Sequence, residues 1–405
     1  MTEIETTTST NGPLTGLRVL DVSTVYAAPI TAMLLGDFGA EVIKVEHPDG
    51  DPARTHGWSR DGHGLWWKVI ARNKHTVTLN LGTAQGQELL RRLVVDADVL
   101  VENFRPGVME KWGLGPDRLL DVNPSLVMLR VTGFGQSGPY AQRRAFGTLM
   151  EAMSGFAHQT GHEDGPPTLP PFGLADGVAG ITGAFAVLTA LYHRDTRGGA
   201  GQVIDLSLLE PLLGILGPGP TVYDQLGLIP GRHGNRSPNN APRNAYLTRD
   251  GRWVAISASA TSVAERVMRL VGRGDLVREP WFGSAGERSR RADLLDAAVA
   301  AWIGEHDLDD VVAAFDDAGA ALAPIYDVEQ MTHDPHVIDR ETITTVPDED
   351  LGPLRMQNLM VRLLDTPGRI RFPGRRLGQD NEEIYGELLG LDGDDLAKLR
   401  EEGVI

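Results

Sequence analysis

Short apolar runs alternate with segments of helical periodicity through the first half of the chain. The first apolar run, residues 17–22, precedes a helical segment at 30–38, and a second apolar run follows at 41–46. Pro29 suits the first turn of that helix, because a residue there needs no backbone N–H for the helix. A strand, a helix and a strand in this order predict a β-α-β unit within a parallel sheet.

The same alternation continues as far as residue 207. It predicts further strands at 76–81, 98–102, 126–132 and 203–207, and helices at 85–94, 108–112, 116–122, 148–157 and 181–193. The last helix has almost no polar residue before Tyr192, so we expect it to be buried on every face. The longest apolar run, residues 178–191, is too short to span a membrane, and we expect no membrane partner. The pattern predicts an α/β fold whose ligands bind at the carboxyl ends of parallel strands.

The pattern changes after residue 216. Gly and Pro at 217–220 and an Asn/Pro/Arg-rich loop at 230–243 predict a linker. A β-hairpin is predicted at 246–257, where Asp250-Gly251 forms the turn, and helical segments follow to residue 310, so a small α+β domain fits 217–320. Residues 321–405 then carry strands and loops at 321–328 and 351–363 and two amphipathic helices at 381–389 and 393–402.

Composition and charge exclude several classes of function. The 405 residues carry a net charge of −17, which argues against nucleic acid as a partner. Cysteine is absent, so disulfides, thiolate nucleophiles and cysteine-based metal sites are excluded, and a cytoplasmic protein fits. Residues 1–13 are rich in Thr, Ser and Glu, which predicts a disordered leader and not a signal peptide. No metal site is expected, because four histidines lack metal-ligand spacing: His47, His56, His63 and His75.

Positive charge is concentrated in the first half of this acidic chain. Cations that follow strand ends favour a phosphate-bearing ligand, although solvated surface charge is the alternative for most of them. The turn after the first strand lacks Gly-x-Gly-x-x-Gly, so a dinucleotide is disfavoured even though Glu46 stands where a ribose-binding acid would lie. The cations are Lys44, Arg54, Arg60, Arg72, Lys74, Arg105, Lys111, Arg143 and Arg144.

One carboxylate, Asp176, stands among small residues just before the predicted helix at 181–193, with no cation nearby in the sequence. It has two interpretations. An aspartate before an apolar helix caps free N–H groups and stabilises the helix by about 0.5–2 kcal/mol. Alternatively, the carboxylate performs chemistry. The local pattern alone favours the cap, although the two roles are not exclusive.

The order of several segments resembles the class III CoA-transferases, a family that includes formyl-CoA and carnitine CoA-transferases and α-methylacyl-CoA racemase. The matching segments are 14–21, 39–46, 72–74, 97–107, 174–176, 237–242 and 388–391. The resemblance implies a Rossmann-like large domain that binds CoA, with its N-terminal part at 14–216 and a C-terminal part at 321–405 that returns to it. It also implies that two chains interlock as a homodimer.

In that family the residue matching Asp176 is the nucleophile. Its carboxylate attacks an acyl-CoA thioester to give a mixed anhydride, and the released thiolate then forms an aspartyl-CoA thioester. An incoming carboxylic acid reverses these steps. The resemblance thus implies a CoA-transferase that uses acyl-CoA as a substrate and keeps no permanently bound cofactor. We expect backbone N–H groups, that of Gly177 among them, to stabilise the oxyanion.

The resemblance also assigns CoA-binding positions, for each of which a packing or surface role is the alternative. Tyr26 replaces a glutamine of the formyl-CoA enzyme, His47 stands at a basic position, and Lys111 at a position that is often arginine. The expected CoA-binding residues are Val25, Tyr26, Ala27, His47, Leu79, Asn80, Leu81, Asn103, Phe104, Arg105, Lys111, and Arg143 or Arg144.

Two departures bear on the reaction. Phe146 stands where the racemases have a proton-transferring histidine, and Gly147 replaces the acid that follows it. The loop at 236–243 replaces the glycine run of the formyl-CoA enzyme, so formyl and oxalate are not supported. A racemase or epimerase is therefore disfavoured, and a CoA-binding protein without turnover remains as a further alternative. The donor and acceptor acids stay open.

Overall fold

The computed structural model describes residues 12–405. The chain divides into two compact units. The sheet unit comprises Met1–Gly155, Pro170–Gly217 and Ile338–Ile405, and the small unit comprises Phe156–Leu169 and Pro218–Val337. The expected domain boundaries, after residues 216 and 320, stay predictions; the unit boundaries nearest to them fall after Gly217 and Val337. The expected leader at 1–13 lies almost wholly outside the described residues.

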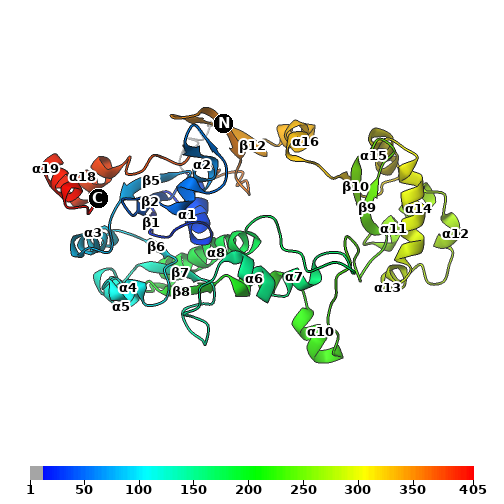
Figure 1. Cartoon of the computed structure of the whole chain (residues 1–405), viewed down its shortest axis with the longest axis horizontal. Coiled ribbons are helices and arrows are strands. Elements are labelled where there is room, and N and C mark those ends of the chain that lie inside the picture. Colours follow the sequence, from blue (N-terminus) through cyan, green and yellow to red (C-terminus); the bar gives the residue numbers. More distant parts are fainter. Residues whose placement is uncertain (1–11) are drawn as a thin grey trace, which may run out of the picture. The chain divides into compact units, whose positions relative to one another are not determined.

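A six-stranded parallel sheet forms the centre of the sheet unit, in the order β5-β2-β1-β6-β7-β8 (Figure 1). The strands are β1 Arg18–Asp21, β2 Glu41–Glu46, β5 Lys74–Thr78, β6 Val99–Glu102, β7 Val127–Thr132 and β8 Val203–Ser207. The predicted α/β fold with a parallel sheet is confirmed. From β1 to β5 successive strands are added toward one edge of the sheet, and from β6 to β8 toward the other. The carboxyl ends of β1 and β6 therefore flank a crevice of the kind that binds ligands.

Helices cover both faces of this sheet because alternate strand residues point to opposite sides. Leu20 and Leu100 join a core with α3, α5 and α18, whereas Val19 and Val99 join a second core with α1 and α8. The helices of the unit are α1 Ala27–Asp37, α2 Leu65–Ile70, α3 Ala84–Val94, α4 Val108–Lys111, α5 Pro116–Val122, α6 Gly147–Met153, α8 Leu174–Arg197, α9 Leu209–Ile215, α18 Asn381–Leu389 and α19 Gly393–Glu401. The 3-10 helix Pro52–Thr55 and the pairs β3 Ser59–Arg60 with β4 His63–Gly64 and β12 Ile343–Asp348 with β13 Gly352–Gln357 complete it.

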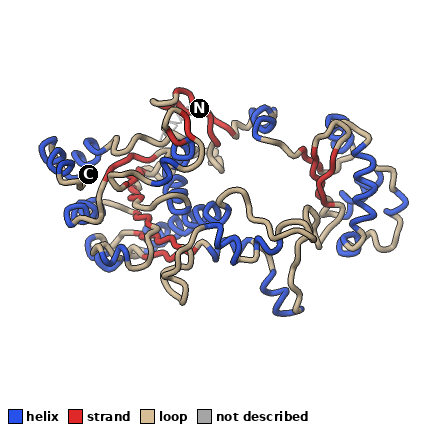
Figure 2. The backbone as a smooth tube through the Cα atoms, in the orientation of Figure 1, coloured by secondary structure: helices blue, strands red, loops and turns tan. Residues whose placement is uncertain are grey.

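The small unit contains a three-stranded antiparallel sheet packed on helices, as Figure 2 shows by colour. Its strands are β9 Arg243–Leu247, β10 Trp253–Ser257 and β11 Leu322–Pro324. The predicted hairpin is confirmed, because β9 and β10 pair antiparallel around the turn. Its helices are α7 Phe156–Gln159, α10 Gly219–Leu226, α11 Thr261–Leu270, α12 Gly274–Val277, α13 Ala285–Ser289, α14 Ala292–Gly304, α15 Leu308–Asp317 and α16 Val328–His333, and α17 Pro335–Asp339 crosses into the sheet unit.

Helix α8 differs from its prediction in length and burial. It begins at Leu174 and has 24 residues, more than the predicted run. By length and composition alone it could cross a membrane, a test that a helix in the core of a soluble protein also passes. One face packs in the core with α1 through Ala179 and Val187. The expectation of burial on every face was wrong, since an apolar strip on the helix is exposed: Ile181, Phe185, Leu188 and Tyr192. An apolar sequence cannot distinguish a face packed on the sheet from a face open for another contact.

Candidate functional site

The crevice between β1 and β6 is shaped by a strained turn at the end of β1. Val25 has a φ of 69°, a left-handed conformation that β-branched residues rarely adopt. The backbone N–H of Tyr26 donates to the carbonyl of Thr24 at 3.1 Å, which closes a three-residue γ-turn. Asn103, the residue after β6, fixes this turn: its Oδ1 accepts from the Thr24 N–H at 2.8 Å, and its Nδ2 donates to the Thr24 carbonyl at 2.7 Å. The turn directs Tyr26 into the site.

Buried ion pairs contact the same turn and stabilise it. Asp51 Oδ1 accepts from the Val25 N–H at 3.2 Å, and Asp51 Oδ2 lies 3.1 Å from Lys44 Nζ. Lys74 Nζ is 2.8 Å from Asp21 Oδ2. Burial alone would raise the pKa of Asp21, but the charges of Lys44 and Lys74 outweigh it and lower that pKa. These two lysines are therefore structural cations.

The predicted concentration of positive charge thus needs a correction. Lys44 and Lys74 are buried, as is Arg72, which pairs with Asp37, and Arg54 pairs with Glu46. Sequence position could not show that acids from other elements neutralise these groups. Within residues 12–405, four exposed cations of the predicted set form no ion pair: Arg105, Lys111, Arg143 and Arg144.

Several predicted CoA-binding residues meet at one pocket beside the crevice. A cavity of about 220 Å³ is lined by the segment from Asn103 to Pro106 and by the segment from Arg143 to Phe146. The guanidinium of Arg143 stacks over the Tyr140 ring at 3.6 Å. The structure therefore brings together the expected positions Asn103, Phe104, Arg105, Arg143 and Arg144.

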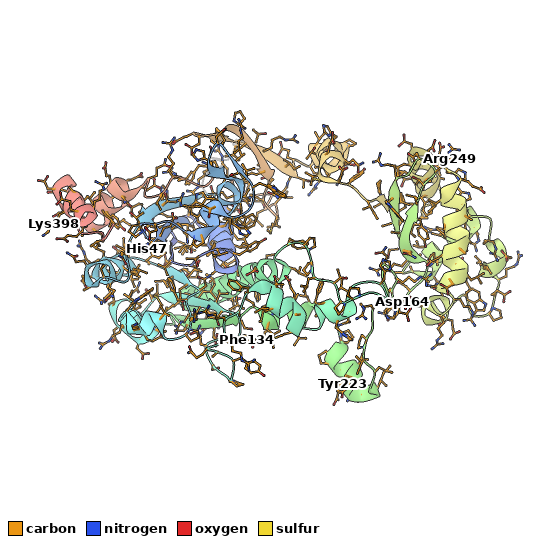
Figure 3. The ribbon with its side chains drawn as sticks, viewed as in Figure 1. His47, Phe134, Asp164, Tyr223, Arg249 and Lys398 are labelled. Atoms are coloured by element: carbon orange, nitrogen blue, oxygen red, sulfur yellow. The ribbon has the colours of Figure 1, made fainter. Side chains whose placement is uncertain are left out.

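The remaining expected contacts lie further along the sheet. His47, which is labelled in Figure 3, follows β2 and is exposed. Its Nδ1 lies 3.2 Å from Asp49 Oδ2. Leu79 and Leu81 are buried in the core shared with α18, and Asn80 Oδ1 accepts from the Gly82 N–H at 3.0 Å. These residues follow β5 and β2, the two strands furthest from the crevice on that side. Their contacts with CoA stay predictions.

Asp176 lies in the first turn of α8, half-buried between α6 and the β1–α1 turn. The N-cap of α8 is Gly173 and Asp176 is the third residue of the helix, so the prediction that Asp176 is the N-cap was wrong. A Cβ added to Gly147 would lie 2.0 Å from Asp176 Oδ2. A Cβ on Gly173 would lie 3.2 Å from both that oxygen and Tyr26 Cζ. The two glycines create the space that the carboxylate occupies beside Tyr26.

A second carboxylate, Glu151, lies next to this space and was not predicted. It is 1% exposed, and its Oε1 accepts from the backbone N–H of Ala175 at 3.1 Å. Burial, and then the charge of Glu151, raise the pKa of Asp176 to about 6. The sequence held one signal for the position of Glu151, because Gly147 and Glu151 are four residues apart and so lie on one face of the helix.

The hydrogen-bond donors at the site differ from those expected. The N–H of Gly177 donates to the Gly173 carbonyl at 2.9 Å, so its expected role in stabilising an oxyanion was wrong. Tyr26 stacks on Trp66 with ring centroids 4.7 Å apart. Burial and the charges of Asp176 and Glu151 raise the pKa of Tyr26, which keeps its hydroxyl protonated and able to donate.

One group of potential metal ligands occurs within residues 12–405, away from Asp176. Ligand atoms of His75, Asp380 and Glu383 lie within 4.8 Å of one another. Asp380 Oδ2 already accepts from the Thr76 N–H at 2.6 Å, and its Oδ1 pairs with Arg375. A guanidinium at that oxygen disfavours a cation there.

The fold and site together define a doubly wound α/β protein with a half-buried carboxylate beside a ligand crevice and exposed cations. A family model described as CoA-transferase family III matches residues 14–381. The chain belongs to CoA-transferase family III. The family predicted from sequence, and with it the class of enzyme, is confirmed.

Relatives of known name match over nearly full length. The chain is 43% identical to the succinyl-CoA–D-citramalate CoA-transferase of Chloroflexus aurantiacus, over 97% of this chain and 98% of that protein. It is 33% identical to the succinyl-CoA:mesaconate CoA-transferase of Haloarcula marismortui, over 83% of this chain and 86% of that protein. A crystal structure of a CAIB/BAIF family protein from Brucella suis superposes with a TM-score of 0.82 at 30% identity, covering 93% of this chain and all (100%) of that one.

Proposed function

We propose that the protein moves CoA between two carboxylic acids through covalent adducts on Asp176. The observation that carries this proposal is a half-buried carboxylate whose pKa is raised to about 6 and which no described cation neutralises. At neutral pH such a carboxylate is mostly ionised, and it is more basic than an ordinary aspartate. It lies within reach of the crevice at which α/β sheets bind ligands.

The reaction begins when a carboxylate oxygen of Asp176 attacks the thioester carbonyl carbon of the donor acyl-CoA. The C–S bond breaks, CoA leaves as a thiolate, and a mixed anhydride remains on Asp176. The thiolate then attacks the Asp176 carbonyl carbon, which releases the donor acid and leaves an aspartyl-CoA thioester. The acceptor carboxylate attacks the aspartyl-CoA thioester and expels the CoA thiolate, which gives a second mixed anhydride. The thiolate then attacks the carbonyl carbon of the acceptor, so that the new acyl-CoA departs and Asp176 is restored.

Each attack places negative charge on a carbonyl oxygen, which a nearby donor stabilises. The Tyr26 hydroxyl is one candidate, since it borders the same space as Asp176 Oδ2. The start of α6 at Gly147 is the second, because the first N–H groups of a helix have no acceptor within the helix. Both candidates are donors because Asp176 lies between α6 and the β1–α1 turn that carries Tyr26.

CoA would bind along the carboxyl edge of the sheet. The exposed guanidinium groups of Arg105, Arg143 and Arg144 would contact its phosphates at the 220 Å³ cavity, and Lys111 follows one turn later on α4. Asn103 serves this site by fixing the β1–α1 turn. His47 and the segment 79–81 would contact the nucleotide end of CoA at the sheet edge.

The names of the relatives indicate the substrates. The proteins from Chloroflexus aurantiacus and Haloarcula marismortui are named for succinyl-CoA with D-citramalate, L-malate or mesaconate. We therefore propose succinyl-CoA as the donor and a four- or five-carbon dicarboxylic acid as the acceptor. Phe146 cannot carry a proton, so a racemase reaction that depends on a histidine at this position is disfavoured.

We also propose that the protein is a cytoplasmic homodimer. The exposed apolar strip on α8, which includes Ile181, Phe185 and Leu188, supports a further protein contact on that helix. Light scattering coupled to size exclusion tests this proposal. A stable monomer at low concentration would contradict it.

Trapping tests the covalent proposal. The protein is incubated with succinyl-CoA alone, treated with hydroxylamine or borohydride, digested, and mapped by mass spectrometry. A modified peptide containing Asp176, absent from the Asp176→Asn variant, supports the mechanism. Deuterium exchange at the α-carbon without an adduct would instead favour a racemase, and tight CoA binding with neither result would favour a binding protein.

A further inference from the structure

We propose that Glu151 is a positioning residue whose buried carboxyl group, held by α6 beside Asp176, destabilises the ionised nucleophile relative to its uncharged covalent adducts. This inference rests on the proposed function, because it concerns the chemistry of Asp176. Its geometry comes from one face of α6, on which Gly147 borders the Asp176 carboxylate and Glu151 bonds to the residue before it.

The absence of a counterion distinguishes Glu151 from every other buried carboxylate within residues 12–405. Each of the others forms an ion pair with an arginine or lysine. These are Asp21, Asp37, Glu46, Asp51, Glu102, Asp296, Asp348 and Asp380. Glu151 instead accepts a single backbone hydrogen bond, from Ala175, and faces another acid. A buried carboxyl group without a counterion is costly to stability, so its presence at the site points to a role in the reaction.

The groups that face Asp176 come from two elements packed against α8. Glu151 approaches from α6, and Tyr26 approaches from the β1–α1 turn. On α9, which also packs on α8, Glu210 is held by a hydrogen bond from the Ser207 hydroxyl and contributes no charge to Asp176. No described cation acts on the Asp176 carboxylate. Repulsion between the two acids is therefore uncompensated.

Covalent chemistry relieves this repulsion. An ionised Asp176 carries a negative charge, whereas the mixed anhydride and the aspartyl-CoA thioester carry none at that side chain. The attack by Asp176 thus moves negative charge away from Glu151 and onto the departing thiolate. The raised pKa of Asp176 acts in the same direction, because a more basic carboxylate is a stronger nucleophile.

Glu151→Gln removes the acidic group and keeps a side chain of nearly the same shape. The amide keeps a side-chain oxygen that can accept from the Ala175 N–H, so α8 should stay in place. We expect the acidic limb of kcat/KM for succinyl-CoA to move down by about one pH unit, and adduct formation at pH 8 to slow by about tenfold, the factor that one pKa unit represents. The KM for succinyl-CoA should change little. A purely structural Glu151 would leave the pH profile unmoved.

Two further measurements complete the test. Glu210→Gln removes one acidic side chain from α9 of the same unit and should leave the pH profile unchanged. Carbon-13 NMR of labelled aspartate, assigned with Asp176→Asn, should show the carboxyl of Asp176 titrating at lower pH in Glu151→Gln. An adduct on wild-type Asp176 together with an unchanged pH profile in Glu151→Gln would overturn the role of Glu151 alone. No adduct in the wild type would overturn the proposed function and this role with it.

Discussion

Gly147→Ala should inactivate the enzyme while leaving the fold intact. The added methyl group would lie 2.0 Å from Asp176 Oδ2 and 2.9 Å from its Cγ, far closer than non-bonded atoms approach. The buried start of α6 leaves the methyl group no room, so the carboxylate must rotate or move by about 1 Å, a displacement that can cost about 100-fold in rate. Alanine also suits a helix better than glycine, by up to about 1 kcal/mol, so stability should not fall by more than the strain of the contact.

The assay compares kcat/KM for succinyl-CoA with the melting temperature of the same sample. The matched control is Gly214→Ala on α9, where an added methyl group meets nothing within 4 Å. We expect the control to keep full activity and Gly147→Ala to lose about 100-fold at a similar melting temperature. Unchanged activity in Gly147→Ala would refute the reasoning that this glycine makes room for the nucleophile.

Three further predictions follow from the site. Activity should fall as pH drops through about 6, because Asp176 must be ionised to attack. The pKa of Asp176 is raised from 3.8 in the folded state, so the folded protein holds this proton more tightly than the unfolded chain and the free energy of unfolding should decline as pH rises from about 4 to 6. Chemical denaturation across that pH range measures this decline. Tyr26→Phe keeps the stacking on Trp66 but loses the hydroxyl, so kcat should fall by about 10- to 100-fold with little change in melting temperature, and an unchanged kcat would exclude the hydroxyl as an oxyanion donor. Arg105→Ala should weaken CoA binding by about tenfold or more in calorimetry, an effect that salt reduces, whereas Arg91→Ala on α3 should not.

The sheet was predictable because its physical basis is local. Parallel strands covered on both faces give short apolar runs, and β2 and β8 begin and end where those runs do. The start of α8 was missed because Gly177 and Gly180 weaken a helical pattern that tertiary packing restores. Its exposed face was missed as well, since periodicity reports apolar character and not what covers it.

The centre of the site was only partly predictable. Asp176 was identified through family resemblance, and the local pattern alone favoured a helix cap that the structure excludes. Glu151 escaped notice because its partner, Ala175, is 24 residues away and a loop brings the two together. The role of Gly147 was likewise hidden, because the sequence shows a missing side chain but not the carboxylate that fills its place.

Isotope transfer tests the central claim most directly. If Asp176 is the covalent nucleophile, one oxygen of the acceptor carboxylate must pass into Asp176 when the second anhydride is broken. Turnover of succinyl-CoA with a dicarboxylic acid labelled with oxygen-18 should therefore place label in the peptide that contains Asp176, and then in the succinate released by later turnovers. Label in the succinate with none in Asp176 would contradict the account, because the two acids would then have exchanged CoA without the aspartate.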